Sequence, residues 1–258
     1  MLRRNLLPAL LSLAVVVAAP ATRAESIVIS GVGTAGTWST NLILTNPSAT
    51  PLTVEVAYAP SEYLYCLGGA APCFLEISIP AFGTMQPNLA DLQVSGVGTI
   101  YIIPTDDTGL LPSVRARVVN AAFPGEAIEL PVIRQSTLTS IAPTTLSFAG
   151  ATLTSDSYTN LMIAAVFPAG PARPMFDITV HIEAFDTNGT LLGTRDTSVD
   201  PFVPFFMPHV LEALGVTSLE NGQLRVTQTS GAVSLPWGVM STLTPATGDV
   251  AVSQGLVP

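Results

Sequence analysis

The sequence contains no lysine, and only 10% of its 258 residues are charged, against an average of about 25% in soluble domains. Nine arginines stand against 18 acidic residues, which gives a net charge of −9. Such a chain has no basic patch that could neutralise phosphates, and nucleic acid is therefore excluded as a partner. Intrinsic disorder is excluded too, because 48% of the residues are hydrophobic.

Catalytic groups are also scarce. The two histidines are His181, on the polar face of an expected strand, and His209, at the start of an expected helix. We interpret both as ordinary surface or loop residues. The chain lacks both the Gly-x-Ser-x-Gly elbow of hydrolases and the His-Glu-x-x-His motif of zinc enzymes. The sequence therefore predicts a protein that is not an enzyme and has no catalytic residue and no cofactor.

Oxygen-bearing side chains gather in two short segments, residues 106–109 and 186–189. Calcium takes about six to eight oxygen ligands, and neither segment has the spacing of an EF-hand loop. Asp and Asn side chains also stabilise turns by bonding to their own backbone. We expect two turns here, and no metal site.

Residues 1–24 have the pattern of a secretory signal peptide. Arg3 and Arg4 give a positive start, residues 6–19 are apolar, and small residues precede a cleavage site before Glu25. The alternative is an uncleaved anchor helix, but the apolar stretch is shorter than the roughly 20 residues that a span needs. General secretion and twin-arginine export both remain open as routes.

Cleavage after Ala24 leaves six arginines against 18 acidic residues and a net charge of −12. A field of that sign slows the approach of anionic partners, so protein surfaces and neutral glycans remain as candidates. The mature chain has no apolar run long enough to span a membrane. We therefore expect a secreted protein of the periplasm, the extracellular space or the cell surface.

Cys66 and Cys73 are the only cysteines, and export favours a disulfide between them. Tyr58, Tyr63 and Tyr65 lie close to this expected hairpin in the sequence. Aromatic rings on a constrained loop can stack on sugars or anchor a protein partner. The alternative is a loop that folds back on its own sandwich.

Strand patterns dominate the mature chain. One expected strand covers residues 176–185, and within it Ile178, Val180 and Ile182 share one face by strict alternation. Asn188-Gly189 then predicts a hairpin with a type I′ turn. Helical patterns are confined to two short segments that each begin with proline, at residues 87–92 and 208–214. Other expected strands cover residues 26–29, 41–45, 52–58, 74–79, 99–103, 113–119, 190–199, 222–227 and 233–243.

An internal repeat organises these strands. Thr40-Asn41-Leu42 recurs as residues 159–161, residues 52–56 recur as 178–182, and residues 98–102 recur as 222–226. We predict two copies of an all-β unit of about 110 residues. The fold class is therefore all-β, with two tandem immunoglobulin-like β-sandwich domains, each with one short helix. The first covers residues 25–135 and holds the disulfide hairpin, and the second covers residues 136–258.

One known group shares this pattern. The sequence has a signal peptide, then Thr-Asn-Leu-x-Leu-x-Asn-Pro at residues 40–47, and then a short helix before a strand that begins with glycine. In this order of features it resembles uncharacterised secreted bacterial proteins built from tandem immunoglobulin-like sandwich units. The resemblance covers most of residues 26–250. It implies the tandem sandwich fold and supplies no catalytic residues.

Phe202, Phe205 and Phe206 lie in the most apolar stretch of the second repeat. They either cover the open end of its core or form an interface between repeats or chains. The function we expect is that of an exported, non-catalytic structural or adhesive protein. A carbohydrate-binding module that uses the hairpin tyrosines is the alternative. A small exported hydrolase is a third hypothesis, for which the sequence offers no nucleophile and base.

Overall fold

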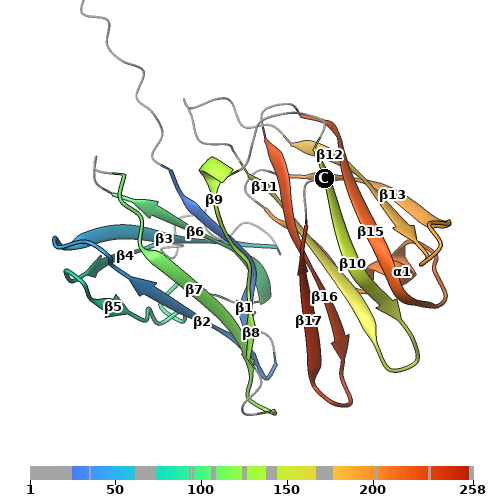
Figure 1. The fold of residues 1–258 in the computed structure, drawn as a ribbon, viewed down its shortest axis with the longest axis horizontal. Coiled ribbons are helices and arrows are strands. Elements are labelled where there is room, and N and C mark those ends of the chain that lie inside the picture. Colours follow the sequence, from blue (N-terminus) through green and yellow to red (C-terminus); the bar gives the residue numbers. More distant parts are fainter. Residues whose placement is uncertain are drawn as a thin grey trace, which may run out of the picture.

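The structure is a computed structural model that describes residues 25–34, 36–61, 74–92, 94, 96–105, 109–123, 127–137, 144–166, 177–200, 203–231 and 234–255. These residues form four antiparallel β-sheets, and two of the sheets lie in each half of the chain (Figure 1). The predicted all-β sandwich class is confirmed.

The first half contains a five-stranded sheet of order β4-β3-β6-β1-β9 and a four-stranded sheet of order β5-β2-β7-β8. A 3₁₀ turn, η1 (Gln135–Thr137), follows the last strand. The strands are β1 (Ile27–Thr34), β2 (Trp38–Thr45), β3 (Leu52–Pro60), β4 (Phe74–Ile79), β5 (Thr84–Met85), β6 (Gly96–Pro104), β7 (Ser113–Asn120), β8 (Ala127–Glu129) and β9 (Val132–Arg134).

The second half contains two four-stranded sheets, of order β10-β15-β12-β13 and β14-β11-β16-β17. A single helical turn, α1 (Val210–Ala213), lies between β14 and β15. The strands are β10 (Thr145–Leu153), β11 (Tyr158–Val166), β12 (Ile178–Phe185), β13 (Leu191–Val199), β14 (Phe205–Met207), β15 (Leu219–Ser230), β16 (Leu235–Thr244) and β17 (Asp249–Gln254).

The two halves have the same strand order. The run β4-β3-β6-β1 corresponds to β13-β12-β15-β10, and β5-β2-β7-β8 corresponds to β14-β11-β16-β17. The predicted match of strand order is therefore confirmed, whereas the independence of each half as a domain stays a prediction. Each half is a two-layer sandwich, but its connectivity differs from that of an immunoglobulin domain. The first two strands of an antibody domain share a sheet, whereas here β1 and β2 belong to different sheets.

A threonine in the repeated Thr-Asn-Leu motif makes the same contacts in both halves. The Thr40 hydroxyl donates to the Gly33 carbonyl and accepts from the Gly33 N–H, at 3.2 and 3.0 Å. Thr159 makes the equivalent pair of bonds with Thr152, both at 2.8 Å. Each buried hydroxyl thus ties the end of one strand to the start of the next, across the two sheets of its sandwich. The motif therefore has a structural role.

The asparagine of the Asn-Pro pair occurs only in the first half, and it is structural as well. Asn46 is 1% exposed, and its Nδ2 donates to the carbonyl oxygens of Thr50 and Pro80 at 2.7 and 3.1 Å. Its Oδ1 accepts from the Ser48 N–H at 2.9 Å. One side chain therefore fixes the turn after β2 against the end of β4.

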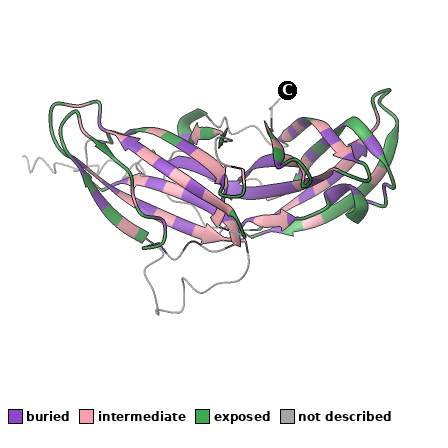
Figure 2. Ribbon diagram, turned by 90° about the horizontal axis from the view of Figure 1, so that it is seen from below, coloured by how far each residue is buried: buried purple, intermediate pink, exposed green. Residues whose placement is uncertain are grey.

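Alternating side chains build a separate core in each half. Ile178, Val180 and Ile182 are all fully buried, as their alternation predicts. Leu52, Val54 and Val56 occupy the equivalent places on β3. Figure 2 shows buried segments alternating with more exposed ones along the strands of both halves.

Two local predictions are wrong. Residues 87–92 form hydrogen-bonded turns instead of a helix, with the Leu92 N–H bonded to the Leu89 carbonyl at 3.2 Å. In the described part of the first half there is accordingly no α-helix. In the second half, α1 begins after His209, so Pro208 is not its first residue. Both segments still occupy the same place in their halves, directly before β6 and β15.

The hairpin between β12 and β13 is present, but its turn is not type I′. Gly189 has a φ of +82°, whereas Asn188 does not have a positive φ. The Asp186 carboxylate accepts from the backbone N–H groups of Asn188 and Thr190, both at 2.8 Å. The Thr190 bond is the main cause that lowers the pKa of Asp186. The predicted turn at residues 186–189 is therefore confirmed in kind, and the segment at residues 106–108 lies outside the described residues.

Candidate functional site

Several predicted site residues lie outside the part of the chain that the structure describes. They are Cys66, Cys73, Tyr63, Tyr65 and Phe202. The disulfide and the aromatic hairpin therefore stay predictions.

Tyr58, the third tyrosine of that predicted site, belongs to the first core. It is 4% exposed, and it lies on the face of β3 that also carries Val54 and Val56. Its ring covers Gly98 so closely that a Cβ atom on Gly98 would lie 2.5 Å from it. The prediction that Tyr58 presents its ring to a ligand is corrected, because alternation along β3 turns the side chain inward.

The two described phenylalanines of the predicted interface point to opposite faces of their strand. Phe205 packs against the core of the second half. Its neighbour Phe206 points the other way and lines a cleft between the two halves. The alternation of β14 explains this division, since successive side chains of a strand point to opposite faces.

A third apolar cluster joins the two halves. It consists of Val28 from β1 and Ala164, Val166, Leu235 and Trp237 from β11 and β16, with Tyr101 and Ile133 packed against it. Trp237 is 1% exposed, and its indole Nε1 has no hydrogen-bond partner within the described residues. The Trp237 ring therefore packs against the apolar side chains of the cluster, but its buried Nε1 stays without a hydrogen-bond partner among the described residues.

Sequence reasoning missed this cluster, although a signal was present. Residues 161–166 and 235–240 are buried at every position, so β11 and β16 are covered on both faces. In the sequence these strands read as continuous apolar runs without alternation. Such a run is typical of a strand buried on both sides.

Beside the cluster lies a cleft of about 250 Å³ between the two halves. The first half contributes residues of β1, β2, β6, β7 and β8, among them Trp38, Val118 and Ile128. The second half contributes residues of β11, β14, β16 and β17, among them Tyr158 and Phe206. In Figure 1, β16 and β17 lie on the side of the second half that faces β1 and β8.

A glycine that lines the cleft lets the halves approach each other. Gly31 has a φ of +83° and lies at a bulge between Ser30 and Val32 of β1. Its N–H points at the Met162 sulfur, 3.2 Å away. A Cβ atom at this position would lie 3.1 Å from Val239. The bulge and the absent side chain together bring β1 against β11 and β16.

A second glycine marks another contact between the halves, and neither it nor its partner is among the residues that line the cleft. Gly248, in the turn between β16 and β17, packs directly against the Phe123 ring, which follows β7. The halves are therefore in contact at Gly248 as well as at Gly31.

His209 stands beside the cleft in a backbone conformation that is unusual for histidine, with a φ of +49°. Its ring stacks on Tyr158 at 4.2 Å between centroids, and its N–H donates to Asn160 Oδ1 at 3.0 Å. Its Nδ1 lies 3.0 Å from a Glu212 carboxylate oxygen. Since Tyr158 and Asn160 both line the cleft, His209 fixes two of its wall residues.

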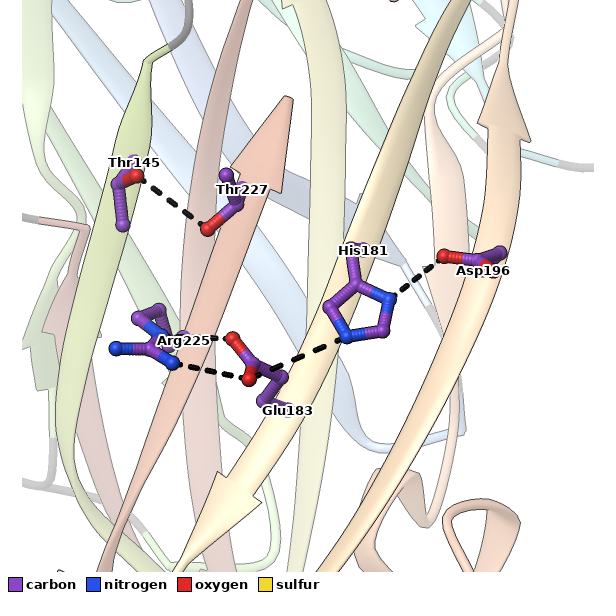
Figure 3. Close-up of polar contacts among 6 residues, drawn as sticks. All are labelled: Thr145, His181, Glu183, Asp196, Arg225 and Thr227. Atoms are coloured by element: carbon purple, nitrogen blue, oxygen red, sulfur yellow. Dashed lines mark hydrogen bonds and ion pairs between the residues drawn. The ribbon is translucent and has the colours of Figure 1, made fainter. Parts of the chain in front are cut away.

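His181 takes part in a different arrangement, on the outer face of the β10-β15-β12-β13 sheet (Figure 3). Its Nδ1 lies 2.7 Å from Asp196 Oδ1, and its Nε2 lies 4.0 Å from Glu183 Oε1. Arg225 holds the same Glu183 through two bonds of 2.7 and 2.9 Å. The Arg225 guanidinium lowers the pKa of Glu183, and Glu183 in turn raises the pKa of Arg225.

This network lacks the geometry of a nucleophilic triad. In such a triad the second imidazole nitrogen faces the hydroxyl that attacks the substrate. Here Nε2 of His181 faces a carboxylate that is already held by Arg225. The neighbouring hydroxyls of Thr145 and Thr227 are paired with each other at 3.3 Å. The arrangement is an ion-pair network on a sheet surface.

In the described part of the chain, no three His, Cys, Asp or Glu side chains are grouped so that they could hold a metal ion. Nor do these residues include a helix of the length and hydropathy that a membrane crossing requires. No protein-family model matches the chain, and neither a curated protein nor a solved structure is significantly similar to it.

Proposed function

We propose that the chain is an exported, non-catalytic protein with a structural or adhesive role at the cell surface or in the extracellular space, and that its two sandwiches act as one stiff unit. The observation that carries this proposal is the third apolar cluster around Trp237. The signal-peptide pattern of residues 1–24 and the tandem all-β architecture support it.

A stiff joint suits a role in which distance and orientation must be kept. Interfaces between domains of one chain are usually polar and allow relative motion, unless they are large and hydrophobic. Here the joint consists of fully buried apolar side chains, with Trp237 and Val28 at 1% and 0% exposure. A force or a bound partner at one end of the molecule would therefore be transmitted to the other end.

The charge distribution supports partners that are neutral or apolar. Arg115 and Arg117 are neighbours on β7, but both are paired with the same Glu129 carboxylate, at 2.6 Å each. These contacts lower the pKa of Glu129, so the carboxylate stays ionised beside them. The excess of negative charge over the whole chain is thus not offset by a cationic patch at these two arginines. Protein surfaces and neutral glycans are the partner classes that fit.

The experiment compares cells that produce the protein with cells from which its gene has been deleted. We expect deletion to reduce attachment to a surface or retention of envelope material, and the wild-type gene to restore it. A gene carrying Trp237→Phe should restore it as well, whereas Trp237→Ala should not, because only alanine empties the joint. Equal behaviour of deleted and producing cells, or full restoration by Trp237→Ala, would contradict the proposal.

A further inference from the structure

We infer that the cleft between the two halves is a binding site for a small uncharged molecule with an apolar body and a single hydrogen-bonding group. This inference goes beyond the structural or adhesive role and does not depend on it.

The walls of the cleft determine the body of the ligand. Aromatic rings come from both halves, as Trp38 from β2, Tyr158 from β11 and Phe206 from β14. Aliphatic side chains such as Val118 and Leu243 fill the space between them. Most of these side chains are only partly buried, so their apolar surface faces the cleft. A ligand with an apolar body would remove that surface from water, which is favourable in proportion to the area covered.

The charge of the ligand follows from the same walls. Among the described residues that line the cleft there is no Asp, Glu, Lys, Arg or His. A charged group placed there would lose its water without gaining an opposite charge, which is costly. The negative charge of the whole chain also disfavours an anion. The cleft is therefore complementary to a neutral molecule.

A few neutral polar groups provide for one or two hydrogen bonds. Among the described residues, the hydroxyls of Tyr158 and Ser241 and the indole N–H of Trp38 have no hydrogen-bond partner in the protein. A sugar would bring many hydroxyls into a mostly aliphatic space, and most of them would lose their water without a partner. A molecule with one hydroxyl or carbonyl group avoids that cost.

The size of the cleft limits the ligand to a small molecule. A volume of 250 Å³ equals the liquid volume of about eight water molecules, at about 30 Å³ each. It lies below the 300–1,000 Å³ typical of sites for drug-sized ligands. Gly31, which lines the cleft, lies close to Val239 of the other half, so the two walls are in contact without a ligand.

The test titrates the mature chain with 1-naphthol, which has an apolar ring body and one hydroxyl, by isothermal titration calorimetry. The matched charged compound is 1-naphthoate, and methyl glucoside represents a sugar. We expect saturable binding of one 1-naphthol per chain, an affinity for 1-naphthoate lower by about tenfold or more, and no binding of methyl glucoside. Absence of saturable 1-naphthol binding, or equal or tighter binding of either other compound, would overturn the inference.

The site itself is tested with Ser241→Phe, which places a ring in the cleft. Ser147→Phe is the control, because it makes the same change on β10, where Ser147 does not line the cleft. We expect the first variant to lower the affinity for 1-naphthol by about tenfold or more and the second to change it by less than about twofold. Equal effects of the two would place the binding elsewhere and refute the assignment. Thermal unfolding checks that both variants fold, and Ser241→Leu replaces the larger substitution if Ser241→Phe does not.

Discussion

Replacing Trp237 by alanine tests how strongly the third cluster couples the two halves. A buried Trp or Phe that is cut back to alanine costs about 3–5 kcal/mol, through lost burial and the cavity left behind. Part of this is offset here, because the indole N–H of Trp237 is buried without a partner in the described structure, a state that itself costs about 1 kcal/mol or more. We therefore expect a net loss of about 2–4 kcal/mol. Trp237→Phe keeps most of the ring and removes the unpaired N–H, so its loss should stay below about 1.5 kcal/mol.

The assay is urea denaturation followed by two signals. Trp38 is the only tryptophan left in either variant, so its fluorescence reports the first half and its side of the cleft, while circular dichroism reports the strands of both halves. In Trp237→Phe we expect the two transitions to coincide. In Trp237→Ala the transitions should separate, because the halves lose their main apolar contact. If Trp237→Ala unfolds at the urea concentration of Trp237→Phe with coincident signals, the reasoning about the cluster is refuted.

Three further predictions concern other parts of the chain. Glu183→Gln should lower stability by less than about 1 kcal/mol at neutral pH. Because Arg225 lowers the pKa of Glu183, this contribution is present at neutral pH and is lost as the pH falls through that lowered pKa. Chemical denaturation measures the difference between variant and wild type, and a difference that does not change with pH would contradict the prediction. Gly98→Ala should cost about 1–3 kcal/mol by forcing a methyl group against the Ala59 carbonyl oxygen and the Tyr58 ring, and unchanged thermal stability would refute this close packing. Cys66 and Cys73 should react with no thiol reagent in exported protein until a reductant is added, and two free thiols would disprove the disulfide.

Alternation and repetition in the sequence predicted the sandwich class and the matching strand order. The strand at residues 177–183 is recognisable because a buried face next to a solvated face leaves a period of two. The recurrence of Thr-Asn-Leu identified β2 and β11 as equivalent, since both need a threonine hydroxyl at the same place. The short strands β5, β8, β9 and β14 were not predicted, because two or three residues cannot show a period.

The candidate site could not be predicted, because it is formed by contacts between the halves. Nothing local in the sequence indicates that Gly31 meets Val239 or that Gly248 meets Phe123. The positive φ of His209, which fixes Tyr158 and Asn160, also depends on tertiary contacts. At Tyr58 the sequence pattern points to the wrong environment, since its position near the cysteines suggests a loop residue although the strand continues to Pro60.

Residual dipolar couplings of the mature chain in solution show whether the two sandwiches form one stiff unit. Amide couplings of the first half, from β1 to β9, and of the second half, from β10 to β17, are measured in one weakly aligned sample. We predict that a single alignment tensor fits both sets with the relative orientation of Figure 1. Two tensors of clearly different magnitude would show that the halves move independently, so that the molecule is not one stiff unit.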